Sequence, residues 1–424
     1  MSSETAASTM NQDSTTALVP KLRFPEFRGA EKWKLKAGNS LFAQIKDRNP
    51  EPCLPVLAIT QEHGAIPRYM INYHVSVTEK SIENYKVVQV GDFIISLRSF
   101  QGGIEYSHYH GICSPAYVIL RRRVNGSDEF FRHYLKTDGF IRVLTKNLEG
   151  LRDGKMISYA QFSELLLPIP SHDEQKRIAD CLSSLDELIA AQAQKVEVLK
   201  THKKGLMQQL FPREGESQPR LRFPEFQEAG EWVSDSLESL TSTKISYGIV
   251  QAGPHISDGM PYIKSTDLNS KLCLANLART SDAIARKYRR SEVLPGDIVF
   301  SLRGNIGIAQ IVPESIAVAN LTQGTARIRT KGSPEFYLYA LYNPSVRNSI
   351  LAVAKGSTFQ EISLQALRTI RLSHPELAEQ QRVASCLISL DALITAESQK
   401  LEALKTHKKG LMQQLFPSAE ESQP

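Results

Sequence analysis

Three residue patterns in the sequence resemble catalytic motifs, and each of them is incomplete. The string from Gly150 to Met156 approaches the phosphate-binding loop GxxxxGK[ST], but it is one residue short and lacks the Ser or Thr that would hold magnesium. His108 and His110 flank a tyrosine without the HExxH spacing of a zinc site, so we expect them in a polar loop. Ser114-Pro115-Ala116-Tyr117 lacks the acidic or amide residue and the second proline with which amino-methyltransferases grip a target base. We therefore expect a protein that binds a target without catalysing its reaction.

Length and composition favour a globular protein with two domains. The chain has 424 residues, of which 41% are hydrophobic and 23% charged, and it contains no apolar run long enough to span a membrane. Its five cysteines are scattered and form no CxxC pair, so neither a disulfide framework nor a metal site is predicted. The first 19 residues are rich in Ser and Thr and lack the pattern of a signal peptide. We expect a cytoplasmic protein with a disordered leader.

Basic residues gather in two clusters, one in each half of the chain. The net charge is +6, which points weakly to a polyanionic partner. Arg121, Arg122 and Arg123 are consecutive, and the second cluster runs from Arg286 to Arg290. Each cluster alone could be a solvated surface run. A cluster in both halves makes contact with nucleic-acid phosphates an equal alternative.

The chain is a tandem duplication of a unit about 200 residues long. Residues 199–212 read LKTHKKGLMQQLFP, and the same letters recur at 404–417, 205 positions later. The string LRFPEF likewise occurs at 22–27 and at 221–226. This period is far too long for a solenoid repeat, so we expect two whole domains, each followed by a helix. Such a protein suits a target with two parts.

Each copy ends in a predicted helix whose apolar residues alternate at spacings of four and three. They are Ile178, Leu182, Leu185, Ile189, Val196, Leu199, Leu206 and Leu210 in the first copy, and Val383, Leu387, Leu390, Ile394, Leu401, Leu404, Leu411 and Leu415 in the second. Matching polar residues interrupt the two series, namely Gln192 with Glu397 and Lys203 with Lys408. Sustained heptads predict a coiled-coil seam, and a helix of about 38 residues is about 57 Å long. The simplest arrangement packs the two helices antiparallel.

The two helices also carry a short basic segment, at 201–204 and again at 406–409. These segments are interpreted as solvated helix faces, with partner binding as the alternative. The domains before the helices are predicted to mix short strands with helices near 130–144 and 336–353. Strands are expected within 87–98, 116–121, 261–264, 293–303, 308–312 and 325–328.

The duplicated features resemble those of the specificity (S) subunit of type I restriction-modification systems. A GD-x-(I/V)-x-SLR element reads GDFIISLR at 91–98 and GDIVFSLR at 296–303. A Pro-x-x-x-Glu-Gln string starts each helix, at Pro170 and at Pro375, and Pro212 and Pro417 follow the helices. The resemblance covers essentially the whole chain after residue 19.

This resemblance implies an α+β fold with two homologous target-recognition domains, each reading one half of a bipartite site in double-stranded DNA. Two long helices, packed as an antiparallel coiled coil with an internal two-fold, would separate the domains and set the spacer. They would also bind two modification subunits that methylate adenine with S-adenosylmethionine. Restriction subunits would add translocation and cleavage that depend on ATP and Mg. No cofactor is expected in this chain itself, which would be a non-catalytic subunit.

The expected boundaries are a leader at 1–19, domains at 20–170 and 214–374, spacer helices at 171–213 and 375–417, and a tail at 418–424. Two other interpretations stay open. One is a non-catalytic coiled-coil scaffold whose basic surface is incidental, and the other is a regulatory DNA-binding protein.

Candidate DNA contacts lie in loops at matching points of the two copies and in the basic clusters. Amide and hydroxyl side chains could read base edges and cations could hold phosphates, although turn structure explains several of these residues equally well. The candidates are Arg98, Ser99, Gln101, Arg121, Arg122, Arg123, Arg152, Lys155, Tyr247, Gln251, Lys264, Ser265, Lys287, Arg289, Arg303, Asn305, Ser357, Thr358 and Gln360.

Overall fold

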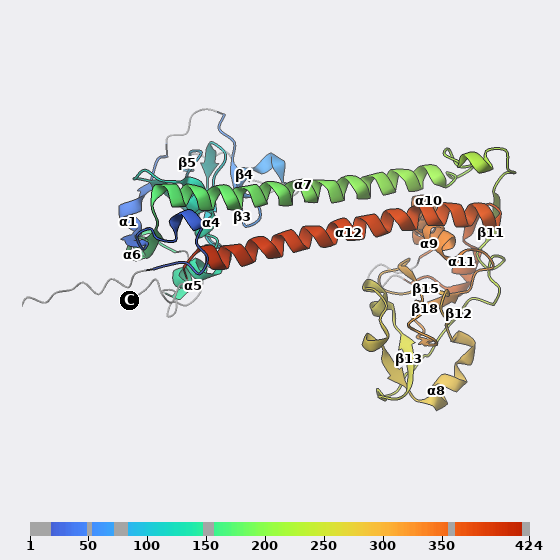
Figure 1. Cartoon of the computed structure of the whole chain (residues 1–424). Helices are drawn as coiled ribbons and strands as arrows, with labels where there is room; N and C mark the ends of the chain where they lie inside the picture. The colour runs from blue at the N-terminus through green and yellow to red at the C-terminus, as the bar shows by residue number, and fades with distance from the viewer. Residues whose placement is uncertain (1–17, 49–52, 72–83, 147–156, 355–360, 418–424) are drawn as a thin grey trace, which may run out of the picture. The chain divides into compact units, whose positions relative to one another are not determined.

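The chain folds into two compact units. The computed structural model describes residues 18–48, 53–71, 84–146, 157–354 and 361–417 (Figure 1). The first unit comprises residues 1–193 and 399–424, and the second comprises residues 194–398. Both long helices therefore cross from one unit into the other. The predicted tail at 418–424 and most of the predicted leader lie outside the described residues.

The first unit contains short strands and helices, followed by the first half of a long helix. Its strands are β1 (Lys34–Ala37), β2 (Phe42–Ile45), β3 (Leu57–Thr60), β4 (Gly64–Pro67), β5 (Lys86–Val88), β6 (Phe93–Ile95), β7 (Glu105–Tyr106), β8 (Gly111–Cys113), β9 (Val118–Arg122) and β10 (Leu166–Ile169). Its helices are η1 (Pro25–Phe27), α1 (Gly38–Leu41), η2 (Arg68–Met70), α3 (Ser99–Gly102), α4 (Asp128–Tyr134), α5 (Asp138–Lys146), α6 (Tyr159–Glu164) and the start of α7 (His172–Leu210).

The second unit repeats this plan with some additions. Its strands are β11 (Val233–Ser236), β12 (Ser246–Tyr247), β13 (Met260–Ile263), β14 (Ala278–Thr280), β15 (Ile298–Ser301), β16 (Ala309–Ile311), β17 (Asn320–Leu321), β18 (Thr325–Ile328) and β19 (Arg371–His374). Its helices are η3 (Pro224–Phe226), η4 (Ser265–Asn269), η5 (Leu274–Asn276), α8 (Asp282–Lys287), η6 (Arg289–Ser291), α9 (Pro334–Tyr342), α10 (Pro344–Ala352), α11 (Leu364–Thr369) and the start of α12 (Leu377–Leu415).

The same antiparallel four-stranded sheet occurs in both units. Its strand order is β2-β9-β6-β7 in the first unit and β12-β18-β15-β16 in the second. Side chains alternate across a strand, so Phe93 faces the core that contains α4 to α6, while Ile94 joins a smaller core with Leu57. In the second unit Phe300 and Val299 divide in the same way. The sequence duplication is thus a duplication of sheet and core.

The two long helices pack antiparallel, as predicted. In the first unit, Leu182 near the start of α7 shares a core with Leu415 near the end of α12. In the second unit, Leu210 at the end of α7 shares a core with Leu387 near the start of α12. The start of each helix therefore packs on the end of the other. Each helix has 39 residues, close to the length that the heptads and boundary prolines indicate.

Three details differ from the sequence-based expectation. The predicted helix at 336–353 is divided because Asn343 caps a new helix, accepting a bond from the Ser345 amide at 3.0 Å, with Pro344 as its first residue. The predicted helix at 130–144 is divided near Thr137, whose hydroxyl accepts a bond from the Phe140 amide at 3.2 Å. Leu18, assigned to the leader, is buried, and its carbonyl accepts a bond from the Trp33 amide at 3.0 Å.

Candidate nucleic-acid interface

The aspartate of each Gly-Asp turn binds an arginine at the end of a neighbouring strand. Asp92 is buried and accepts two bonds from Arg121, at 2.7 and 2.8 Å, and one from the Gln89 amide at 2.7 Å. In the second unit Asp297 accepts two bonds from Arg329, both at 2.7 Å. The bonds to Asp92 raise the pKa of Arg121 above its usual value. These pairs fix the turns, so Arg121 has a structural partner, and its predicted contact with a phosphate stays a prediction.

The other residues of the first basic cluster differ in exposure. Arg122 pairs with Asp128 at 2.5 Å, and its side chain is 17% exposed. Arg123 is exposed to solvent. Of this cluster, Arg123 is therefore the side chain best placed to meet a phosphate.

The turn after β6 contains three predicted DNA contacts, of which one is structural and two are exposed. Ser99 is buried, and its hydroxyl accepts a bond from the Ser96 amide at 2.9 Å, which closes the turn. Arg98 and Gln101 are exposed. Arg98 also lines an open cavity of about 510 Å³ together with Gln61, His63, Ser96 and Glu105. We call this cavity the hairpin groove, because Gln61 and His63 lie at the turn between β3 and β4.

Glu105 is a residue of the hairpin groove that sequence reasoning missed. Its side chain is 2% exposed, one carboxylate oxygen pairs with Lys136, and the other has no hydrogen-bond partner among the described residues. Burial raises the pKa of Glu105 and lowers that of Lys136. Gln61 and Arg98, which are exposed beside this buried carboxylate, carry donors and acceptors of the kind that read base edges. In the sequence, the pointer to Glu105 was a charged residue standing between two hydrophobic ones, Ile104 and Tyr106.

Three loops of the second unit come together at the ends of its strands. Asn305 donates a bond to Asn269 at 3.0 Å, which joins the turn after β15 to η4, and Lys264 and Ser265 stand at the start of η4. Backbone bonds from Thr322 to Ile263 at 3.1 Å and from Ile249 to Leu321 at 2.6 Å link η4 to the segment of Tyr247. The structure thus brings Tyr247, Lys264, Ser265 and Asn305 into one loop cluster, and Gln251 is exposed at its end.

Gly248 explains how closely these loops approach. A Cβ atom at this position would lie 1.7 Å from the carbonyl oxygen of Leu321, so a larger residue cannot be accommodated here without moving the backbone. Arg303 lies beside the cluster and pairs with Glu361 at 2.8 Å, with both side chains nearly half exposed.

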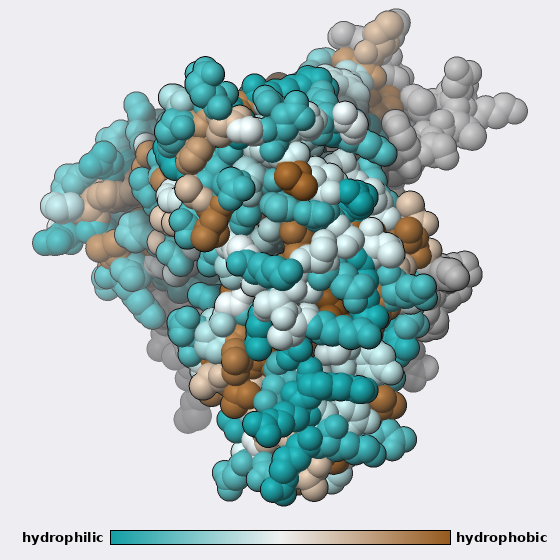
Figure 2. Space-filling model, turned by 90° about the vertical axis from the view of Figure 1, so that its right-hand side faces the viewer, coloured by the Kyte–Doolittle hydropathy of each residue, from teal (hydrophilic) through white to brown (hydrophobic). Residues whose placement is uncertain are grey.

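In the second basic cluster, unlike the first, all four cationic side chains are exposed to solvent. Arg286, Lys287, Arg289 and Arg290 are exposed, and no carboxylate in the described part of the chain forms an ion pair with any of them. The Ser246 hydroxyl donates to the Arg290 carbonyl at 3.2 Å, which ties the cluster to β12 and so to Tyr247. Hydrophilic residues cover most of the face shown in Figure 2, and hydrophobic ones form small separate groups.

The loop predicted before each long helix falls outside the described residues. This concerns Arg152, Lys155, Ser357, Thr358 and Gln360, whose predicted contacts with DNA stay predictions.

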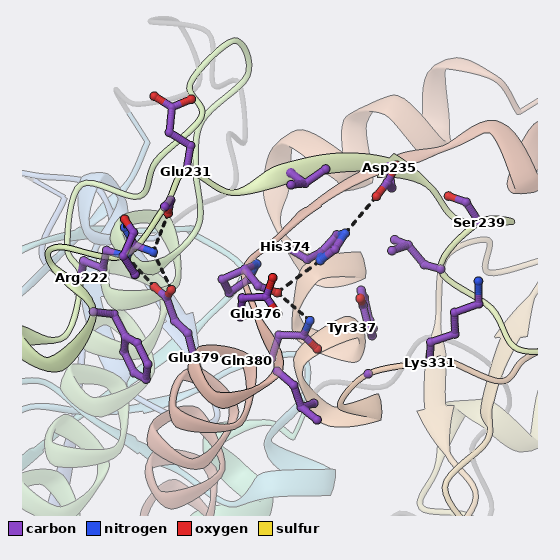
Figure 3. A pocket seen from close by; sticks show the side chains of 18 residues that line it. Arg222, Glu231, Asp235, Ser239, Lys331, Tyr337, His374, Glu376, Glu379 and Gln380 are labelled. Atoms are coloured by element: carbon purple, nitrogen blue, oxygen red, sulfur yellow. Dashed lines mark hydrogen bonds and ion pairs between the residues drawn. The ribbon is translucent and has the colours of Figure 1, made fainter.

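The repeated LRFPEF string forms a buried ion pair with the start of each long helix. Arg222 donates to both carboxylate oxygens of Glu379, at 2.8 and 2.7 Å, and to the Ala229 and Gly230 carbonyls (Figure 3). Arg23 makes the same contacts with Glu174, both at 2.7 Å. In the sequence both strings mark the duplication, and their contact in the fold was not predicted. The sequence signal for this contact was that the Arg and the Glu recur at matched positions of the two copies.

Polar residues in the helix seam connect each helix to the adjacent unit. Lys203 of α7 pairs with Asp391 of α12 at 2.5 Å, and the Tyr339 hydroxyl donates to the same carboxylate at 2.7 Å. In the first unit Lys408 pairs with Asp186, which also accepts a bond from Arg132 at 3.2 Å. The two predicted lysine interruptions therefore hold helix to helix and helix to domain.

Among the described residues, no three His, Cys, Asp or Glu side chains are placed to hold a metal ion. Of the helices that the structure describes, none is both long and apolar enough to cross a membrane.

Comparisons with known proteins agree with the duplicated architecture. A family model described as "Type I restriction modification DNA specificity domain" matches residues 33–201 and again 249–406. The chain is 25% identical over 393 residues to a putative type I restriction enzyme MjaX specificity subunit of Methanocaldococcus jannaschii, covering 88% of each chain. It is 26% identical over 281 residues to the type I restriction enzyme EcoBI specificity subunit of Escherichia coli, covering 60% of this chain and 56% of that one.

Solved structures share the fold at low sequence identity. A chain from a type I R-M system structure has a TM-score of 0.58 at 16% identity, covering 91% of this chain and 97% of that one. The S subunit of the type I restriction-modification system of M. genitalium has a TM-score of 0.53 at 16% identity, covering 95% and 100%.

Proposed function

We propose, because this chain belongs to the type I restriction modification DNA specificity family, that each of its units reads one half of a bipartite DNA site. The chain is a DNA-recognition subunit. The duplicated sheet carries the proposal, since one scaffold presents different side chains at matched loops. Both loops begin with an arginine, Arg98 or Arg303, and then differ, since the first copy continues with Ser99 and Gln101 and the second with Asn305.

In the second unit, the loop cluster supplies the groups that base reading needs. Asn305 and Asn269 carry amides that can bond paired donor and acceptor atoms of an adenine edge, and Tyr247 offers an exposed ring. Beside them, the cluster from Arg286 to Arg290 can hold phosphates and so fix the orientation of the duplex. In the first unit, the hairpin groove with Gln61, Arg98 and Glu105 is the corresponding proposal.

The partners are proposed from the family and from the helices. Exposed hydrophobic side chains along the two helices, Leu188 and Val198 on α7 and Ile388 and Leu393 on α12, support docking of two modification subunits. S-adenosylmethionine, ATP and Mg would then be bound by modification and restriction subunits. The helices, each about 58 Å long at 39 residues, would set the spacer. We expect the complex to act in the cytoplasm, where its DNA is found.

A domain exchange tests this function. Residues 214–374 would be replaced by the matching domain of a relative, the chimaera expressed with its modification subunit, and the methylated adenines mapped by sequencing. We expect one half of the methylated motif to change while the other half and the spacer stay the same. The reciprocal exchange of residues 20–170 is the matched control, and it should change the opposite half. A change in both halves after either exchange, or methylation without a motif, would contradict independent reading.

A further inference from the structure

A second, strongly basic groove lies on the first unit. It has a volume of about 520 Å³ and is lined by α5, by the end of α12 and by Lys21. We call it the basic groove. Its charged lining residues are Lys21, Lys136, Arg142, Lys405, Lys408 and Lys409, with Asp138 as the one carboxylate of the described lining. Six cations against one anion make this groove attractive to a polyanion.

Some of these cations are neutralised by neighbours and others are not. Lys136 pairs with Glu105, Lys408 with Asp186, and Lys409 with Asp138 at 3.3 Å. Lys405 pairs with Glu402, one turn away on α12, at 2.8 Å, and both side chains are more than half exposed. No described carboxylate forms an ion pair with Lys21 or Arg142, and both are exposed. Exposed ion pairs are weak, so Lys405 and Lys409 can exchange their partners for a phosphate.

The internal duplication shows that the fold does not require two of these six cations. Lys136 precedes α5 by two residues, and the corresponding residue before α10 is Tyr342. Arg142 is the fifth residue of α5, and the fifth residue of α10 is Asn348. The helix lysines are present in both copies, at 405 and 409 and at 200 and 204. The extra cations are therefore particular to the first unit.

The basic groove adjoins the hairpin groove through Lys136. This side chain lines the basic groove, pairs with Glu105 of the hairpin groove, and donates to the Gln61 carbonyl at 3.5 Å. Groups suited to phosphates thus lie directly beside groups suited to base edges. This arrangement favours nucleic acid over an acidic protein as the occupant, because a protein partner would not need the adjacent base-reading chemistry.

We propose that the basic groove binds the phosphate backbone of DNA next to the half-site that the first unit reads. This inference rests on the proposed function as a DNA-recognition subunit. Lys21, Arg142, Lys405 and Lys409 contact phosphates, which holds the duplex in place over the hairpin groove. Contacts of this kind release counterions, so they strengthen binding to all sequences and make it steeply dependent on salt.

The test uses the duplication to supply its own control. The variant K21Q/K405Q/K409Q removes three charges from the basic groove. The control R220Q/K200Q/K204Q removes the three matching charges from the second unit, where Tyr342 and Asn348 replace the extra cations. Both full-length chains are assembled with modification subunit, and binding to a random-sequence duplex and to one carrying the mapped site is measured from about 50 to 200 mM salt.

We expect the groove variant to bind both duplexes more weakly by the same factor. Its slope of log affinity against log salt should be shallower by about three units, roughly one for each lost phosphate contact, while the control keeps the original slope. The methylated motif should stay the same. Adding Arg142→Gln to the variant should reduce the slope by about one further unit.

Other outcomes would overturn the inference in recognisable ways. An unchanged slope in the groove variant would show that no phosphate is bound there. Weaker assembly with the modification subunit, with an unchanged slope for the complex that still forms, would make the groove a protein-docking surface. If the unaltered complex showed no preference for the mapped site over random sequence, the proposed function itself would fail, independently of the groove.

Discussion

Substituting Glu379 with alanine should destabilise the second unit more than any change at an exposed ion pair. Glu379 is 3% exposed and Arg222 is 7% exposed, so the substitution leaves a buried guanidinium without its carboxylate. It also removes the acceptor of the Trp232 indole N–H, bonded at 3.2 Å. Arg222 keeps two carbonyl acceptors, from Ala229 and Gly230, which reduce the loss without cancelling it.

The magnitude follows from the burial of this pair. Breaking a buried pair by removing one partner costs about 3–5 kcal/mol. Arg222 and Glu379 both line an open cavity of about 540 Å³ (Figure 3), through which water can reach the guanidinium. We therefore take the lower end of the range, about 3 kcal/mol. With a urea m-value of about 3 kcal/mol per M, the unfolding midpoint of the second unit should fall by about 1 M.

Hydrogen exchange followed by mass spectrometry at increasing urea measures the two units separately. The matched control is Glu225→Ala, which removes the exposed partner of Arg382, bonded at 2.9 Å, from the same repeated string. The control should leave the midpoint within error, because exposed pairs contribute little. Replacing both buried residues, as Arg222→Met with Glu379→Leu, should recover most of the stability. A midpoint for Glu379→Ala equal to that of Glu225→Ala would refute the reasoning, as would an equal shift in both units.

Three further predictions concern acid, the helix seam and base reading. Burial lowers the pKa of His133 from 6.5 to about 2, so below pH 6.5 the unfolded chain takes up a proton that the folded unit refuses. The free energy of unfolding should therefore fall below pH 6.5, by up to about 1.4 kcal/mol per pH unit as the solution is acidified. The variant His133→Tyr, which copies Tyr339 of the second unit, should show a flatter dependence of this free energy on pH in urea unfolding. Leu185→Asp or Leu390→Asp places a charge at a half-buried position of the helix seam. Each should lower the free energy of unfolding in urea by about 1–3 kcal/mol. An unchanged midpoint would mean that the seam does not exclude water at that position. Asn305→Ala should weaken binding to the correct site by about 1–3 kcal/mol and relax the methylated motif at one base, whereas an intact motif at full occupancy would assign Asn305 to turn structure.

Features encoded by neighbouring residues could be predicted from the sequence. The heptads and the prolines at 170, 212, 375 and 417 located both long helices to within a few residues. Turn glycines such as Gly91 and Gly296, whose φ angles are 95° and 86°, marked the start of β6 and β15. Local patterns suffice in these cases because the helices and turns are built from contacts between residues close in sequence.

Contacts between distant residues could not be predicted in this way. Arg121 looked like part of a basic run, but it bonds Asp92, 29 residues away. The cluster from Arg286 to Arg290 is also rich in cations, and it has no such partner among the described residues. Charge density in a sequence does not say which cations find a carboxylate when the chain folds. Glu105 shows the converse, since burial gave chemical interest to a residue that had no motif.

The exchange of helix ends between the units has a consequence for synthesis on the ribosome. The core of the first unit includes Leu415 and Phe416, whereas the second unit is a single stretch, residues 194–398. Domains usually fold in the order in which they are made. Here the first domain to be translated must wait, with part of its core open, until residues beyond 411 have left the ribosome. The second domain can close before the first, and nascent chains truncated within α12 should expose the apolar surface of the first.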